Sequence, residues 1–167
     1  FIPTVLVQGI RSNELLMKVK RGETPLKIDE RVKQVLPDFP KFAITYSIAE
    51  NKEGSQVNQE KMRGSLEDYN KMFHKTYDLS QIPTYNQDLN RRLARKDAKY
   101  ESRSEQLDLV IVVDRLLTGF DAPCLSTIFI DRQPMGAHDL IQAFSRTNRI
   151  FDKNKAYGQI VTFQSPK

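Results

Sequence analysis

The hydrophobic pattern of the chain alternates between short apolar runs and longer stretches in which apolar residues recur at helical spacing. Two runs rich in β-branched and aromatic residues, 42–48 and 107–113, predict strands. The second is apolar at almost every position, which is typical of a central strand buried on both faces of a parallel sheet. Short runs at 127–130 and 160–163 predict two more strands. Because helical segments separate these strands, we predict an α/β domain in which helices flank a parallel sheet.

Helix start and stop signals lie between these strands. Residues 29–36 predict a short amphipathic helix that is stopped by Pro37. The sequences at 65–68 and 84–87 resemble capping boxes, so we expect one helix to begin at each of them. The polar, glycine-containing segment 49–59 is predicted to be a loop.

The composition is that of a soluble domain with a mild basic excess. The 167 residues are 39% hydrophobic and 28% charged, with a formal net charge of +5. No apolar run approaches the roughly 20 residues of a membrane helix, and the apolar start 1–10 lacks the basic leader of a signal peptide. The single cysteine, Cys124, excludes an internal disulfide and is expected to be a small buried apolar group. We expect a cytoplasmic protein without a metal site in this chain.

The predicted helix 137–149 separates an apolar side from a polar side. Successive residues advance by about 100°, which places Gln142, Arg146 and Arg149 together on one side. The other side carries Leu140, Ile141 and Phe144. A guanidinium is always charged and presents a rigid fork of donors that suits phosphoryl oxygens. The polar side therefore fits either phosphate binding or an ordinary solvated helix face.

The loop after the run 107–113 is a second candidate site. Ligands of open α/β sheets bind just beyond the carboxyl ends of the strands. Gly119 would let backbone amides approach a phosphate closely. Asp121 could accept hydrogen bonds from ribose hydroxyls, and Thr118 could donate one to a backbone phosphate. The alternative is a plain connection in which Asp121 caps a turn and Pro123 stiffens it.

Together the two segments resemble a pair of motifs shared by superfamily-two helicases and translocases. The sequence TGFDAP at 118–123 is similar to motif V, and QAFSRTNR at 142–149 is similar to motif VI, which has the form Q-x-x-x-R-x-x-R. A more specific resemblance is to the restriction (R) subunit of type I restriction–modification enzymes. The segments that carry it are 41–47, 85–93, 108–123 and 140–150. The resemblance covers roughly residues 40–163.

The resemblance implies a fragment of a longer subunit. Residues 41–167 would form its second RecA-like motor domain, and residues 1–40 would be a helical lead-in or linker. The first RecA-like domain of the same subunit would hold most of the ATP and Mg²⁺. The implied partners are double-stranded DNA and the methyltransferase and specificity subunits of the restriction complex.

The same resemblance implies a role for each candidate residue. Arg146 and Arg149 would supply an arginine finger, which accelerates phosphoryl transfer by about 10³–10⁵ in other NTPases. Gln142 would orient the phosphate or the domain interface. The motif V residues would couple the nucleotide to the DNA, with Gly119 and Asp121 on the ATP side and Thr118 near the DNA backbone.

Two sequence features of a complete ATPase are missing from the chain. It contains no G-x-x-x-x-G-K-[ST] phosphate loop and no acidic box to hold magnesium. We therefore expect the isolated chain not to hydrolyse ATP. The alternatives are a motor domain of another superfamily-two helicase or remodeller, and a non-enzymatic α/β module that binds DNA or protein.

A basic stretch between residues 91 and 103 is a candidate DNA contact. Its cations are Arg91, Arg92, Arg95, Lys96, Lys99 and Arg103, set against Asp97 and Glu101. We predict that Arg92 and Arg95 contact DNA phosphates; the alternative is a solvated helix face. The nearby aromatic residues Tyr69, Phe73 and Tyr77 are expected to pack in the core or at its edge rather than stack on bases.

A loose nuclease pattern is also present. Asp38, Glu50 and Lys52 match the PD-(D/E)xK arrangement, in which two carboxylates bind Mg²⁺ and a lysine positions water. Catalytic carboxylates must be held rigidly, and Glu50 and Lys52 fall in the predicted loop. We therefore do not assign nuclease activity to this segment.

Overall fold

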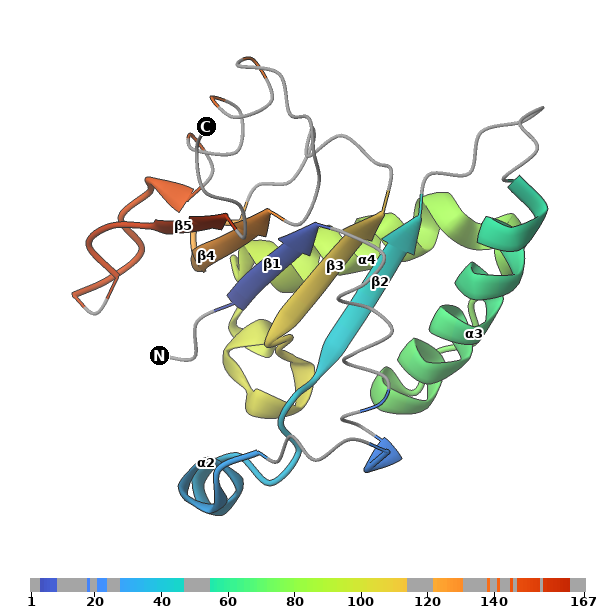
Figure 1. The fold of residues 1–167 in the computed structure, drawn as a ribbon, viewed down its shortest axis with the longest axis horizontal. Coiled ribbons are helices and arrows are strands. Elements are labelled where there is room, and N and C mark those ends of the chain that lie inside the picture. Colours follow the sequence, from blue (N-terminus) through green and yellow to red (C-terminus); the bar gives the residue numbers. More distant parts are fainter. Residues whose placement is uncertain are drawn as a thin grey trace.

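Five parallel strands form one sheet in the computed structural model (Figure 1). The structure describes residues 4–8, 18, 21–23, 28–46, 55–113, 122–130, 138, 141, 145, 147–153 and 155–162. The strands are β1 (Thr4–Gln8), β2 (Phe42–Tyr46), β3 (Leu109–Val113), β4 (Leu125–Ile130) and β5 (Gln159–Thr162). Their order in the sheet is β2-β3-β1-β4-β5. The predicted α/β class, the parallel sheet and the four predicted strands are confirmed.

The middle strand of the sheet is β1, which the sequence analysis did not predict. Its residues pair with β3 on one side and with β4 on the other, both in parallel. A strand hydrogen-bonded along both edges is part of the sheet, because its backbone groups are satisfied only there. The predicted boundary at residue 40 therefore does not separate Thr4–Gln8 from the domain that follows.

Two long helices that the structure describes from end to end accompany the sheet. Helix α3 (Ser55–Phe73) runs alongside β2, and α4 (Ile82–Ala94) lies behind the sheet in Figure 1. The short helix α2 (Glu30–Val35) confirms the prediction for 29–36: Asp29 caps it by accepting a hydrogen bond from the Arg31 amide at 2.8 Å. Short 3-10 helices complete the described elements, namely η1 (Leu79–Gln81), η2 (Ala98–Glu101) and η3 (Arg103–Glu105).

Both predicted capping boxes were wrong. Ser65 lies inside α3, where its hydroxyl donates to the Lys61 carbonyl one turn earlier at 2.9 Å. Helix α4 begins before Thr84, and the cap that is present belongs to Asp78 and Gln81 at the start of η1, which leads directly into α4. Residues 55–59 of the predicted loop are helical, while the rest of that loop lies outside the described residues.

The core lies between the sheet and the two long helices. Its fully enclosed side chains include Ile111 and Ile128 from strands, and Met62, Leu66, Tyr85 and Leu89 from helices. Tyr69 packs against the rings of Phe73 and Tyr85, with centroids 4.7 and 4.9 Å away. The expected packing role of Tyr69 and Phe73 is confirmed, since only 1% and 5% of their surfaces are exposed.

Candidate functional site

The sheet brings the carboxyl ends of all five strands to one edge, because every pair of strands is parallel. From β1 the chain winds out to β2 and back to β3 on one side, and then crosses to β4 and β5 on the other. Such a change of side creates a crevice at the carboxyl edge where ligands bind in open α/β sheets. The connections from the neighbouring strands β1 and β4 leave toward opposite sides, so the topology favours a site at the carboxyl edge beside β1 and β4.

The predicted motif V residues follow β3 at this edge. Thr118, Gly119 and Asp121 lie outside the described residues. The end of the motif is described: Ala122 is buried, and the enclosed thiol of Cys124 donates to the Leu93 carbonyl at 3.0 Å. This confirms the expected buried position of Cys124 and ties the end of the motif to the end of α4.

The predicted helix 137–149 is described in part. His138, Ile141, Ser145 and Thr147 are helical, and residues 148–150 are not, so the helix ends at Thr147. Arg149 follows in non-helical backbone with an exposed side chain.

Gln142 and Arg146 of the predicted motif VI lie outside the described residues. Ile141, expected on the apolar side of the helix, is 64% exposed. The apolar side is therefore not buried at this position, whereas Thr147 is 2% exposed.

A buried lysine holds the end of this helix. The ammonium of Lys155 donates hydrogen bonds to the carbonyl oxygens of Thr147, at 2.9 Å, and of Arg149. Only 3% of Lys155 is exposed, and burial lowers its pKa. The role of Lys155 was not predicted from the sequence, because a lysine after a helix carries no local sign that it will be buried.

The backbone at Gly158 approaches the helix end at Thr147 closely. A Cβ atom placed on Gly158 would overlap with the carbonyl oxygen and the Cβ of Thr147. Only glycine permits such an approach without a shift of the neighbouring chain. A glycine next to a strand often marks a close backbone approach, so Gly158 just before β5 is a sequence signal for this contact.

The structure corrects the predicted DNA contact at Arg92. Its side chain is fully buried, and its guanidinium donates to Tyr69 Oη at 2.9 Å, Asp88 Oδ2 at 3.1 Å and Glu105 Oε2 at 2.7 Å. It also lies over the Phe73 ring, 3.7 Å from the centroid. Burial alone would lower the Arg92 pKa, but Tyr69, Asp88 and Glu105 outweigh it and raise the pKa above its ordinary value. A phosphate on the surface cannot reach this group.

Arg95 is only partly available for DNA. It ends α4 in a left-handed conformation with φ of 49°, and its side chain is half-buried near the Leu107 carbonyl. Burial lowers its pKa. The exposed cations of the stretch are instead Arg91, Lys96 and Lys99.

Asp38 of the nuclease pattern has a structural role. Its carboxylate pairs with Arg103 at 2.9 Å, and Arg103 also binds the buried Asp108. Asp108 in turn accepts a hydrogen bond from the Lys41 amide at 2.8 Å, which joins the starts of β2 and β3. Glu50 and Lys52 lie outside the described residues.

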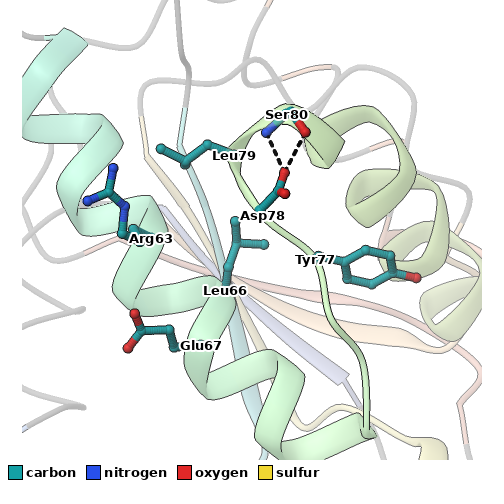
Figure 2. Close-up of a pocket in the computed structure, with 7 residues that line it drawn as sticks. All are labelled: Arg63, Leu66, Glu67, Tyr77, Asp78, Leu79 and Ser80. Carbon is teal, nitrogen blue, oxygen red and sulfur yellow. Dashed lines mark hydrogen bonds between the residues drawn. The ribbon is translucent and has the colours of Figure 1, made fainter.

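A surface hollow of about 410 Å³ lies between α3 and the segment that leads to η1 (Figure 2). Its lining residues are Arg63, Leu66, Glu67, Tyr77, Asp78, Leu79 and Ser80. The Asp78 carboxylate is engaged by Ser80, whose amide and hydroxyl donate to it at 2.8 and 2.5 Å, and these bonds lower the Asp78 pKa. The hollow contains none of the predicted site residues.

Within the described ranges, no group of three or more His, Cys, Asp or Glu side chains is arranged to hold a metal ion. None of the described helices is both long and apolar enough to span a membrane.

Comparison with known proteins matches residues 17–165 to the family "Type I restriction enzyme subunit R domain 3". The match covers most of the chain, and the chain belongs to this family.

Individual relatives agree with the family match. The chain is 32% identical over 152 residues to the type I restriction enzyme SauCOLORF180P endonuclease subunit of Staphylococcus aureus (strain COL), an alignment that covers 89% of this chain and 16% of the relative. A shorter region is 45% identical over 62 residues to the SsaAORF53P endonuclease subunit of Staphylococcus saprophyticus, covering 37% of the chain and 7% of that protein. Another is 41% identical over 66 residues to the HindI endonuclease subunit of Haemophilus influenzae, covering 39% and 6%. The chain thus spans about 16% of the length of the S. aureus relative.

Proposed function

We propose that this chain is the second RecA-like motor domain of an ATP-dependent double-stranded DNA translocase within a type I restriction endonuclease. In this role it supplies an arginine finger and part of the DNA track, while ATP and Mg²⁺ are held mainly by a first RecA-like domain elsewhere in the subunit. The methyltransferase and specificity subunits complete the complex, which we place in the cytoplasm.

The observation that carries the proposal is the position of Arg149. It is exposed directly after a helix end, in a chain that belongs to an R subunit family and that has the Q-x-x-x-R-x-x-R sequence at 142–149. A guanidinium in this position can reach a phosphate that a neighbouring domain presents, because its own domain does not enclose it. The parallel sheet with its change of side at β1 supports the RecA-like assignment.

The chemistry assigned to the chain is electrostatic. The Arg149 guanidinium would stabilise negative charge that develops on the transferred phosphoryl group, and Arg146 would share this role. Gln142, Gly119 and Asp121 are proposed to orient the nucleotide or couple it to DNA, and Thr118 to lie near the DNA backbone. The sequence contains no phosphate loop, and we propose that the other domain cradles the phosphates.

The decisive experiment replaces Arg149 by alanine in the full-length R subunit. DNA-stimulated ATP hydrolysis should fall by about 10³-fold, while affinity for duplex DNA stays nearly unchanged. Lys153→Ala is the matched control, because Lys153 is an exposed cation close by in sequence. Full ATP hydrolysis by Arg149→Ala would refute the motor assignment. Loss of DNA binding with unchanged hydrolysis would favour the non-enzymatic binding module.

A further inference from the structure

We infer that Lys155 is a positioning residue for Arg149: its buried ammonium fixes the backbone at the end of the motif VI helix and so sets the direction in which the Arg149 side chain leaves the domain. This inference rests on the proposed function, since it assigns Lys155 to the arginine-finger site. Lys155 lies outside the Q-x-x-x-R-x-x-R sequence at 142–149.

The two hydrogen bonds from Lys155 carry the argument. The last carbonyls of an α-helix have no partner within the helix, and the negative end of the helix dipole attracts a cation there. Lys155 Nζ donates to the carbonyl of Thr147, the last helical residue, and to that of Arg149. Because one ammonium holds both carbonyls, the backbone from Thr147 to Arg149 is fixed on both sides of the point where the helix ends.

Lys155 is itself held in place by a tight turn. Its amide donates to the carbonyl of Asp152 at 3.2 Å and to Asp152 Oδ1 at 3.0 Å, and its carbonyl accepts from the Phe151 amide at 3.2 Å. The turn thus directs the lysine side chain inward toward the helix end. Burying an ammonium is unfavourable, whereas water satisfies an ordinary helix end without such a cost. In our inference, the fixed backbone geometry at Arg149 is what this cost secures.

Charge repulsion acts in the same direction. Burial lowers the Lys155 pKa most, Cys124 acts in the opposite direction, and the Arg149 charge again lowers the pKa. The same repulsion disfavours any conformation in which the guanidinium folds back over the helix end. It therefore favours the exposed position in which Arg149 is found.

Gly158 provides a second, independent restraint on Thr147. A Cβ on Gly158 would overlap with the Thr147 carbonyl oxygen and Cβ. The segment before β5 therefore packs directly against the helix end, and it follows Lys155 closely in sequence. The turn at Asp152, Lys155 and Gly158 together hold Thr147, the last helical residue, next to the segment that leads into β5.

The test uses the full-length R subunit with Lys155→Met, and with Lys153→Met as the matched control. Lys155→Met should lower kcat for DNA-stimulated ATP hydrolysis by about 10–100-fold with KM for ATP changed less than about threefold, since orientation rather than ground-state binding is lost. Lys155→Arg, which keeps the donors, should recover part of the rate. In the absence of ATP, amide hydrogen exchange at 147–151 should accelerate by about 10-fold or more in Lys155→Met but not in Lys153→Met.

A double variant separates positioning from general destabilisation. If Lys155 acts through Arg149, adding Lys155→Met to Arg149→Ala should lower the residual rate no further, because residues that act as a unit are not additive. Multiplicative losses, or Lys155→Met kinetics equal to those of Lys153→Met, would overturn the inference. If Lys155→Met fails to fold, Lys155→Gln is judged by the same criteria. If Arg149→Ala instead hydrolyses ATP at the full rate, the proposed function itself is overturned.

Discussion

Nη1 of Arg92 lies 2.7 Å from Oε2 of Glu105, with the arginine side chain completely enclosed. This ion pair joins the interior of α4 to the 3-10 helix η3 that precedes β3. The same guanidinium bonds Asp88 and Tyr69. Arg92, which was predicted to contact DNA phosphates, is therefore the centre of a buried polar network.

The first prediction concerns the stability that this network provides. Arg92→Ala leaves Asp88 without its charged partner and opens space beside Phe73, and the removal of one member of a buried pair costs about 3–5 kcal/mol. The measurement is the free energy of local opening at amides of α4 and β3, from hydrogen exchange in the full-length R subunit. Arg91→Ala, at the exposed neighbouring position, should change it by less than about 0.5 kcal/mol. Equal effects of the two variants would contradict the network.

The second prediction isolates the Tyr69 hydroxyl. It donates to Asp88 Oδ2 at 2.8 Å and accepts from Arg92 Nε at 2.9 Å. Tyr69→Phe keeps the ring packing but leaves two buried charged groups with fewer partners, which costs about 1–3 kcal/mol. The same hydrogen-exchange measurement applies, with Tyr157→Phe as control because Tyr157 is 69% exposed. No difference between the two variants would show that the hydroxyl contributes nothing.

The burial of Arg92 could have been inferred from spacing. Tyr85, Leu89 and Leu93 form a helical stripe, and Arg92 falls beside it, three residues after Leu89. The charge of the basic stretch alone predicts a surface position for Arg92, whereas this stripe indicates burial. The acid partners could not have been found in this way, since Glu105 lies in a separate element and its approach to Arg92 depends on the tertiary fold.

Strands were predicted better than helix starts for a physical reason. A buried parallel strand must be apolar along its whole length, so the run 107–113 was unambiguous. A capping sequence is only local, and the hydroxyl of Ser65 is equally satisfied by the carbonyl one turn back in mid-helix. The strand Thr4–Gln8 was missed although its sequence, TVLVQ, is rich in β-branched residues.

The third prediction uses the single cysteine as a reporter of packing at the end of motif V. Cys124 is fully buried and its thiol donates to the Leu93 carbonyl, so the thiolate that reacts with iodoacetamide is not accessible. In the native full-length subunit, mass spectrometry of the peptide that contains Cys124 should show at least about 100-fold slower alkylation than in denaturing urea. Rapid labelling of the native protein would mean that residues 122–125 open easily from the sheet.

The fourth prediction concerns the surface that contacts DNA, which we now expect to consist of the exposed cations near the end of α4. Each phosphate contact contributes about −0.9 to the slope of log affinity against log salt concentration. If Arg91 and Lys96 both lie on the DNA track of the full-length subunit, replacing both by glutamine should make that slope less steep by nearly 2.

Arg92→Gln and Lys71→Gln serve as controls for this measurement. Arg92 is buried in α4, and Lys71 is exposed on α3, outside the basic stretch 91–103 in sequence. Any effect of Arg92→Gln should appear in stability and leave the salt slope unchanged, because a buried guanidinium releases no counterions when DNA binds. A slope that responds to Lys71→Gln as strongly as to the double variant would show that the whole basic surface, rather than the end of α4, contacts DNA. A slope that responds only to Arg92→Gln would return that arginine to the DNA interface and require α4 to rearrange on binding.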